Sequence, residues 1–153
     1  MIKLSALKSD QRELSDNIVV STMDTQVAVK AVIKNLEGKF LIVEQSGRWQ
    51  AVGGRLEKGE KLEDGLRRET KEETGITELE VGKVVHVDEW FAKPEGELVH
   101  IVALFFSCMT NSEEVILSDE HEAYAWVDAS NLDAYGDTVE KDIKQAILLA
   151  SNL

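Results

Sequence analysis

The chain has 153 residues, 43% of them hydrophobic and 30% charged, a balance that is ordinary for a globular protein with a sizeable core. Its formal net charge of −12 would repel a DNA or RNA backbone, which argues against a nucleic-acid-binding protein. The single cysteine, Cys108, excludes an internal disulfide, and the apolar run around it is typical of a core thiol.

No apolar run reaches the ~18 residues of a membrane-spanning helix, and the first residues lack the apolar core of a signal peptide. We therefore expect a cytoplasmic protein that does not bind membranes, folded as one domain over residues 1–153. Residues 1–25 are expected to form an N-terminal arm or edge strand, with a short helix at residues 4–14 and a short strand at residues 17–20 as candidates.

Two strands are predicted next. Residues 26–34 are rich in β-branched side chains, and a turn at residues 35–38 joins them to a second strand at residues 39–44, so the pair is predicted to form a β-hairpin. Trp49 follows and is expected to fill the core at the sheet edge, with substrate contact as the alternative.

A glycine pair then leads into a helix. Gly53 and Gly54 allow the backbone to turn tightly and to approach a ligand closely. Residues 62–74 are predicted to be helical, and Gly75 ends the helix where a left-handed residue is favoured.

One face of this helix combines apolar and acidic side chains. Leu62, Leu66 and Thr70 share it at about 100° per residue. Its edges carry the carboxylates of Glu69, Glu72 and Glu73. Carboxylates that are brought together and partly desolvated take up protons unless a cation compensates them, and Mg²⁺ or Mn²⁺ suits such oxygen ligands. Gly65 is expected to leave room there for metal ions and water, although any single glutamate taken alone would more often belong to a solvated helix surface.

The stretch from Gly54 to Ile76 resembles the Nudix box, the signature of the Nudix hydrolases. The matching identities are Gly54, Glu60, Arg68, Glu69, Glu72, Glu73 and Gly75, with Ile76 at the final hydrophobic position. Two departures concern packing rather than metal ligands. Thr70 stands where the family usually has an aliphatic residue, and Val52 stands where a proline often precedes the two glycines.

The resemblance implies an α/β protein with the Nudix fold, a mixed β-sheet sandwiched between helices. It also implies hydrolysis of a small-molecule nucleotide, a nucleoside diphosphate linked to a group X, with Mg²⁺ or Mn²⁺ as cofactor; relatives are often homodimers. The implied direct metal ligands are the Gly54 carbonyl and the carboxylates of Glu69, Glu72 and Glu73. By the same resemblance, Glu60 orders the loop and can reach a metal through water, and Arg68 orients a catalytic glutamate. Arg68 lies one helical turn before Glu72, so the two side chains are expected to pair.

Two longer strands are predicted after the box, at residues 79–91 and 97–109, joined by a turn at residues 92–97. The second is almost continuously apolar, so we expect it in the middle of the sheet. His86 and His100 share no metal-ligand spacing and are interpreted as structural. Trp90 could stack on a nucleobase or pack in the core.

The last part of the chain is predicted to hold a polar connection with a short strand at residues 111–117, an acidic loop, a strand and a final helix at residues 137–149. Val139, Ile143, Ala146, Ile147 and Ala150 are spaced to cover the sheet. Trp126 is expected in the core. Some Nudix enzymes draw a further glutamate from this loop as metal ligand or general base, and Glu120 is the first candidate and Glu122 the second.

The resemblance thus implies Glu73, Glu72 or a glutamate of this loop as the general base, and an ordinary solvated acidic loop is the alternative for Glu120 and Glu122. The expected substrate is a nucleoside triphosphate, a nucleotide sugar or an ADP-ribose-like molecule. A Nudix-fold sensor that binds a nucleotide metabolite without turnover is the alternative function. An isoprenoid diphosphate isomerase on the same scaffold would need a catalytic cysteine, which Cys108 in an apolar strand does not suit.

Overall fold

Seven strands form one mixed sheet within residues 23–153, the part of the chain that this computed structural model describes. They are β1 (Asp24–Lys34), β2 (Phe40–Gln45), β3 (Arg48–Gln50), β4 (Val52–Arg55), β5 (Glu80–Ala92), β6 (Val99–Met109) and β7 (Ala123–Val127). The main strand order is β3-β2-β1-β6-β5, with β4 paired to β1 and β7 to β2. The helix and strand considered for residues 4–14 and 17–20 lie outside the described residues.

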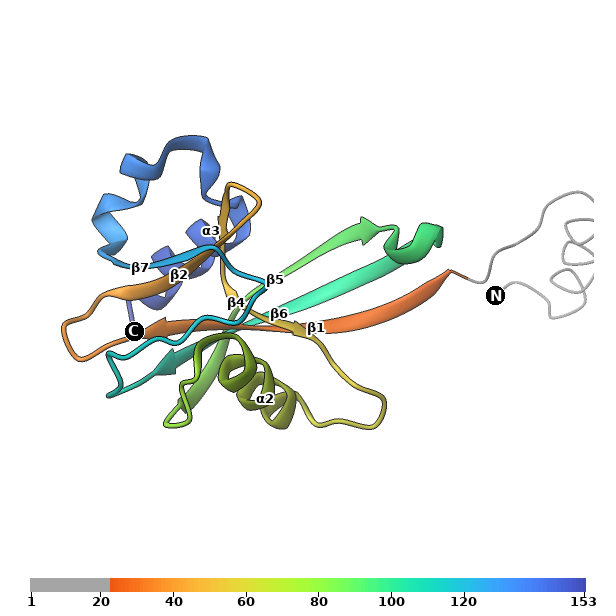
Figure 1. Ribbon diagram of the computed structural model, residues 1–153, viewed down its shortest axis with the longest axis horizontal. Helices are drawn as coiled ribbons and strands as arrows, with labels where there is room; N and C mark the ends of the chain where they lie inside the picture. Colours follow the sequence, from red (N-terminus) through yellow and green to blue (C-terminus); the bar gives the residue numbers. More distant parts are fainter. Residues whose placement is uncertain (1–22) are drawn as a thin grey trace, which may run out of the picture.

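Strand β1 divides the core into two layers because its side chains alternate between the faces of the sheet. Ala28 and Val32 join one buried cluster, which includes Ile143 of the last helix. Val29 and Ile33 join the other, which includes Leu66 of the Nudix-box helix. As Figure 1 shows, α2 (Leu62–Thr74) and α3 (Lys141–Ala150) cover opposite faces of the sheet, so the predicted sandwich is confirmed.

The predicted hairpin of β1 and β2 exists only at its turn. The two strands are paired antiparallel at Lys34 and Phe40, and beyond that point they separate. β1 then pairs with β4 along Ala28–Ala31, while β2 continues along β3 and β7. The local turn was therefore predicted correctly, but other strands take most of the pairing.

The turn expected at Gly53 and Gly54 is wrong, since both lie in β4. Gly53 has φ +142°, and a Cβ built there would lie 2.1 Å from the Val29 carbonyl oxygen and 2.9 Å from the Lys30 Cα. Glycine is needed here because two backbones pass closer than a side chain allows.

The apolar strand β6 lies in the middle of the sheet, as predicted, parallel to β1 and antiparallel to β5. Cys108 within it is buried, and burial raises the pKa of its thiol to about 12. The thiol is thus a core group, as expected. The short helix η1 (Pro94–Gly96) joins β5 and β6 at the end of the arm seen on the right of Figure 1.

Two expectations for the later chain were wrong in detail. Residues 112–118 form no strand; instead, Ile116 donates its backbone N–H to the Thr74 carbonyl and Ser118 donates to the Glu73 carbonyl, so the segment is tied to the end of α2. Helix α3 begins only at Lys141, because the 3₁₀ segment η2 (Ala129–Thr138) occupies the preceding residues. The five apolar positions predicted to cover the sheet are all buried.

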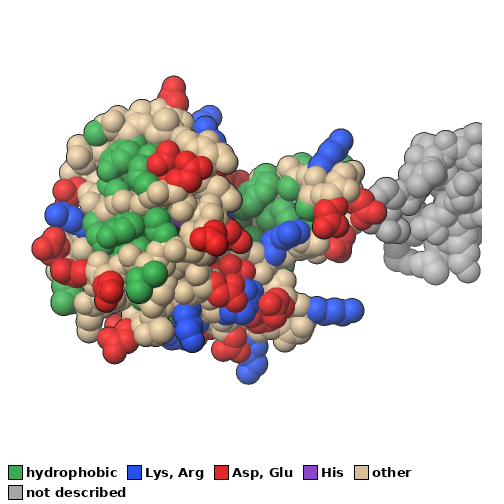
Figure 2. Space-filling view, in the orientation of Figure 1, with side chains coloured by type: hydrophobic (Ala, Val, Ile, Leu, Met, Phe, Trp, Pro, Cys, Tyr) green, Lys and Arg blue, Asp and Glu red, His purple; other side chains and the backbone are tan. Residues whose placement is uncertain are grey.

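Among the helices of residues 23–153, none has the length and apolar character needed to cross a membrane. Figure 2 shows carboxylates spread over the visible face, with apolar areas between them and fewer basic side chains, in keeping with the net charge of −12.

Candidate active site

Helix α2 has the predicted bounds, Leu62–Thr74, and Gly75 ends it with φ +73°. The Gly75 N–H donates to the Lys71 carbonyl, which completes the left-handed cap. Leu66 and Thr70 are buried against the sheet, but Leu62, at the first helical position, is 40% exposed. The buried face therefore begins one turn later than the sequence suggested.

Arg68 connects the loop before α2 to the helix. Its Nε and Nη2 donate to the two carboxylate oxygens of Glu60 at 2.7 and 2.9 Å, and Nη1 donates to Glu69 at 2.9 Å. The sequence-based partner, Glu72, is more distant at 3.3 Å. The two hydrogen bonds from Arg68, with a further one from the Glu57 N–H, lower the pKa of Glu60 to about 2.

Gly65 does not leave room for metal ions, which corrects our expectation. A Cβ at Gly65 would lie 2.4 Å from a methyl group of Leu56 and 2.9 Å from a Glu60 carboxylate oxygen. The space is filled by the loop that carries Glu60, so this glycine serves the close packing of loop and helix.

The carboxylate of Glu69 lies against Gly54. A Cβ at Gly54 would come within 2.6 Å of it, so the missing side chain is what admits the carboxylate. Burial raises the pKa of Glu69, and the nearby charges of Glu73 and Glu72 act in the same direction, against the hydrogen bond from Arg68. Its negative charge is thus incompletely compensated by protein groups.

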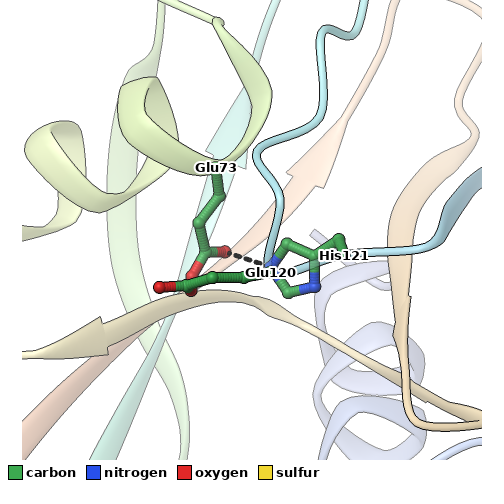
Figure 3. Close-up of side chains that lie close together, drawn as sticks. All are labelled: Glu73, Glu120 and His121. Carbon is green, nitrogen blue, oxygen red and sulfur yellow. Dashed lines mark ion pairs between the residues drawn. The ribbon is translucent and has the colours of Figure 1, made fainter.

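Glu73 points from α2 toward the acidic loop before β7 (Figure 3). It is only 5% exposed, and one carboxylate oxygen accepts a hydrogen bond from the Gly53 N–H at 3.1 Å. The same oxygen lies 3.1 Å from Nε2 of His121. Glu73, Glu120 and His121 each place a ligand atom within 4.8 Å of the other two. Glu122 instead accepts a hydrogen bond from the Ser46 N–H, so Glu120 is the loop glutamate that faces α2.

The donor set is suited to a divalent cation. The carboxylates of Glu69 and Glu73 are partly desolvated and near enough for their charges to interact, Glu120 approaches Glu73 from the loop, and Gly54 contributes backbone beside Glu69. Glu72, with its side chain 58% exposed, lies at the outer edge of the group. Both oxygens of Glu60 are engaged by Arg68, so Glu60 would act on a metal through Arg68 or water rather than directly.

His121 was missed in the sequence. The spacing of 48 residues between it and Glu73 carries no motif, and only its place beside Glu120 in the acidic loop could have indicated a role.

Two cavities adjoin each other, and one of them reaches Gly54. The first, of about 390 Å³, is lined by Gly54, Arg55 and Pro94, and the second, of about 500 Å³, by Gln50 and Asp142. Lys30 and Trp90 line both.

Trp90 therefore faces the cavities, where stacking on a base is possible. Phe91 is 60% exposed and stacks on His100, which contacts Glu89. Trp49 packs edge-on against Tyr135 with ring centroids 5.4 Å apart, as expected for a core residue.

Two half-buried charged residues, Lys30 and Asp142, line the far cavity. Burial lowers the pKa of Lys30. Burial also raises the pKa of Asp142 to about 7, and the carboxyl of Asp88, to which it is hydrogen-bonded, adds to the shift. His86, interpreted as structural, lies beside these two carboxyl groups.

The model of the NUDIX domain matches residues 24–147 of this sequence. The chain belongs to the Nudix hydrolase family. This confirms three expectations from the sequence: the family indicated by the box, the Nudix fold and a pyrophosphohydrolase.

Similar Nudix proteins agree with this assignment. A nucleoside triphosphatase NudI of Klebsiella pneumoniae is 30% identical, over 74% of this chain and 89% of that protein. The crystal structure of the MutT protein from Methanosarcina mazei superposes with a TM-score of 0.70 at 25% identity, covering 85% of this chain and 95% of that one. The MutT Nudix hydrolase from Burkholderia pseudomallei, at 24% identity and a TM-score of 0.68, shares the fold over 82% of this chain and 98% of its own.

The two residues that depart from the Nudix box are both fully buried. Val52 is fully buried in β4 opposite Ala31, where a side chain with β-branching suits the strand. Thr70 is also buried; its carbonyl accepts a hydrogen bond from the Thr74 hydroxyl, while its own Oγ1 has no hydrogen-bond partner within residues 23–153. Neither residue belongs to the acidic group.

Proposed function

We propose that this Nudix hydrolase cleaves the pyrophosphate bond of a nucleoside diphosphate linked to a group X, by attack of water and with Mg²⁺ or Mn²⁺ as cofactor. The observation that carries the proposal is a set of carboxylates around α2: Glu69 lies against Gly54, and Glu73 meets Glu120 of the acidic loop. Gly54 also lines a cavity whose wall includes Trp90. This arrangement provides cation ligands next to space for the rest of a nucleotide.

Each residue of the group has a distinct part in the proposal. The Gly54 carbonyl and the carboxylates of Glu69, Glu72 and Glu73 would hold divalent cations, which supply charge neutralisation of the diphosphate and a more acidic bound water. Glu60 accepts a hydrogen bond from Arg68 and so fixes the guanidinium, and Nη1 of Arg68 in turn donates to the Glu69 carboxylate at 2.9 Å. Arg68 is thus the residue that orients a carboxylate of the site.

The proton acceptor for the attacking water is one of Glu72, Glu73 and Glu120. Their replacement by glutamine distinguishes them, because loss of a general base lowers kcat while metal binding is retained. Loss of a metal ligand lowers both kcat and the affinity for the metal.

The first substrate class to test is the nucleoside triphosphates. Two features support it. Trp90 and the half-buried Lys30 line both cavities and offer an aromatic face and an amine, and the similar protein of Klebsiella pneumoniae is named a nucleoside triphosphatase. The products would be a nucleoside monophosphate and pyrophosphate.

The test is release of monophosphate from nucleoside triphosphates, ADP-ribose, NADH, nucleotide sugars and dinucleoside polyphosphates, with Mg²⁺, with Mn²⁺ and with chelator. We expect turnover that requires metal and falls by at least about 100-fold in Glu73→Gln. Glu122→Gln is the matched control, because Glu122 lies in the same loop but contacts Ser46. Absence of turnover on every compound, with a nucleotide still raising the melting temperature, would favour the sensor and refute the proposal.

A further inference from the structure

His121 is held rigidly beside the acidic group. The backbone N–H of His121 donates to the Ser118 carbonyl at 3.3 Å, and the backbone N–H of Ser118 donates to the Glu73 carbonyl at 3.1 Å. On the other side, the backbone N–H of Glu122 donates to the Glu44 carbonyl at 2.9 Å. The loop is therefore tied to both α2 and β2 on either side of the imidazole. The position of His121 relative to Glu73 is set by backbone contacts rather than by the side chain.

The imidazole is buried without a satisfied hydrogen bond. The side chain of His121 is 3% exposed, and neither ring nitrogen has a well-aligned partner among the described residues. Nε2 lies 3.1 Å from Glu73, close enough for attraction but without hydrogen-bond geometry. Buried ring nitrogens normally have a hydrogen-bond partner. The imidazole of His121 has none among the described residues, so its partner would have to be a bound ligand.

Two carboxylates face the same imidazole. Glu73, Glu120 and His121 each present a ligand atom within 4.8 Å of the others, and Figure 3 shows the three side chains converging. Ligand atoms around one cation with bonds of roughly 2.0–2.2 Å lie about 3–4 Å apart, so small side-chain rotations would close the set. Two carboxylate oxygens and one nitrogen form a mixed ligand set, unlike the oxygen ligands that the rest of the acidic group offers.

We propose that Glu73, Glu120 and His121 bind one divalent cation together, and that the imidazole nitrogen makes this position favour Mn²⁺ and Co²⁺ over Mg²⁺. Imidazole is a better ligand for transition metals than for Mg²⁺, which prefers oxygen and keeps its water molecules. The inference rests on the proposed function, because Glu73 belongs to both ligand sets.

The test is pulsed electron paramagnetic resonance of the Mn²⁺-loaded protein, which detects nitrogen bound directly to the metal. Wild-type protein should show imidazole ¹⁴N modulation, and growth with ¹⁵N-labelled histidine should replace it by the ¹⁵N pattern. The chain has three histidines, so His86→Gln and His100→Gln are matched controls and should retain the signal.

His121→Gln should lose the signal and bind Mn²⁺ at least about tenfold more weakly, since even loss of an outer contact typically weakens metal binding by roughly 10- to 100-fold. Its affinity for Mg²⁺ should change less, so the preference for Mn²⁺ should shrink. If this variant does not fold, the labelled wild type and the two control variants still identify the histidine by elimination.

Mn²⁺-loaded wild type without nitrogen modulation, or a signal that disappears in His86→Gln, would overturn the inference and leave His121 as a contact of Glu73 alone. Metal-dependent hydrolysis together with that result would leave the proposed function standing. Nitrogen modulation that is lost only in His121→Gln, without metal-dependent turnover of any substrate, would support the metal site and refute the proposed function.

Discussion

Replacing Gly53 by alanine should destabilise the protein far more than replacing a glycine in an open turn. Gly53 has φ +142°, a conformation that costs other residues about 1–3 kcal/mol. The added Cβ would lie 2.1 Å from the Val29 carbonyl oxygen, on the central strand β1, where no side-chain rotation can relieve the overlap. Overpacking of this kind costs about 1–3 kcal/mol, so the total loss should be about 2–6 kcal/mol.

Gly38→Ala is the matched control. Gly38 also has positive φ, +79°, but no atom lies within 4 Å of a Cβ built there, so only the backbone cost of about 1–2 kcal/mol applies. Urea unfolding of the metal-free proteins should give a free energy of unfolding for Gly53→Ala at least about 1 kcal/mol below that of Gly38→Ala. Equal values within error would show that β1 and β4 separate easily, and would refute the reasoning from close backbone approach.

Gly53→Ala should also affect the site. The Gly53 N–H donates to Glu73 at 3.1 Å, so movement of β4 would displace a proposed metal ligand. Activity should therefore fall at temperatures where the variant is still folded, whereas Gly38→Ala should keep wild-type activity. A folded, fully active Gly53→Ala would contradict this coupling.

Two further predictions concern charged groups. Burial raises the pKa of Asp142 from its ordinary value of 3.8 to about 7, so the native state holds a proton that the unfolded chain releases, and stability should decline as pH rises from about 4 through 7. Because Asp142 is partly exposed, its share of the decline should be about 1–2 kcal/mol, and Asp142→Asn should remove that share in thermal unfolding across that range. The raised pKa of Glu69 gives a decline of the same sign that the variant would keep, and the lowered pKa of Asp88 acts only at lower pH. Arg68→Lys keeps the charge but loses the paired hydrogen bonds to Glu60, so urea unfolding should show a loss of about 1.5–3 kcal/mol and kcat should fall; unchanged values would mean that charge alone suffices.

Local sequence rules were enough for helix α2 and for the interior strand β6. Helix α2 begins at Leu62 and ends at Gly75 because its periodicity and its left-handed cap depend on neighbouring residues only. The apolar run of β6 indicated a strand inside the sheet, and the structure has it between β1 and β5. The Nudix box could be recognised for the same reason, since its residues lie within one loop and one helix.

Tertiary structure decided the features that depend on distant residues. Gly53 and Gly54 have no intrinsic preference for a strand, and their place in β4 follows from pairing with β1. Arg68 was expected to pair with Glu72 one turn away, but the folded loop brings Glu60 closer.

His121 lies 48 residues beyond Glu73 in the chain, and only the docking of the acidic loop on α2 and β2 brings its imidazole within 3.1 Å of that carboxylate. The sequence by itself thus determined the local elements and the set of carboxylates. Which of them lie together, and which imidazole joins them, depends on contacts between segments far apart in the chain, for which local periodicity and spacing carry no signal.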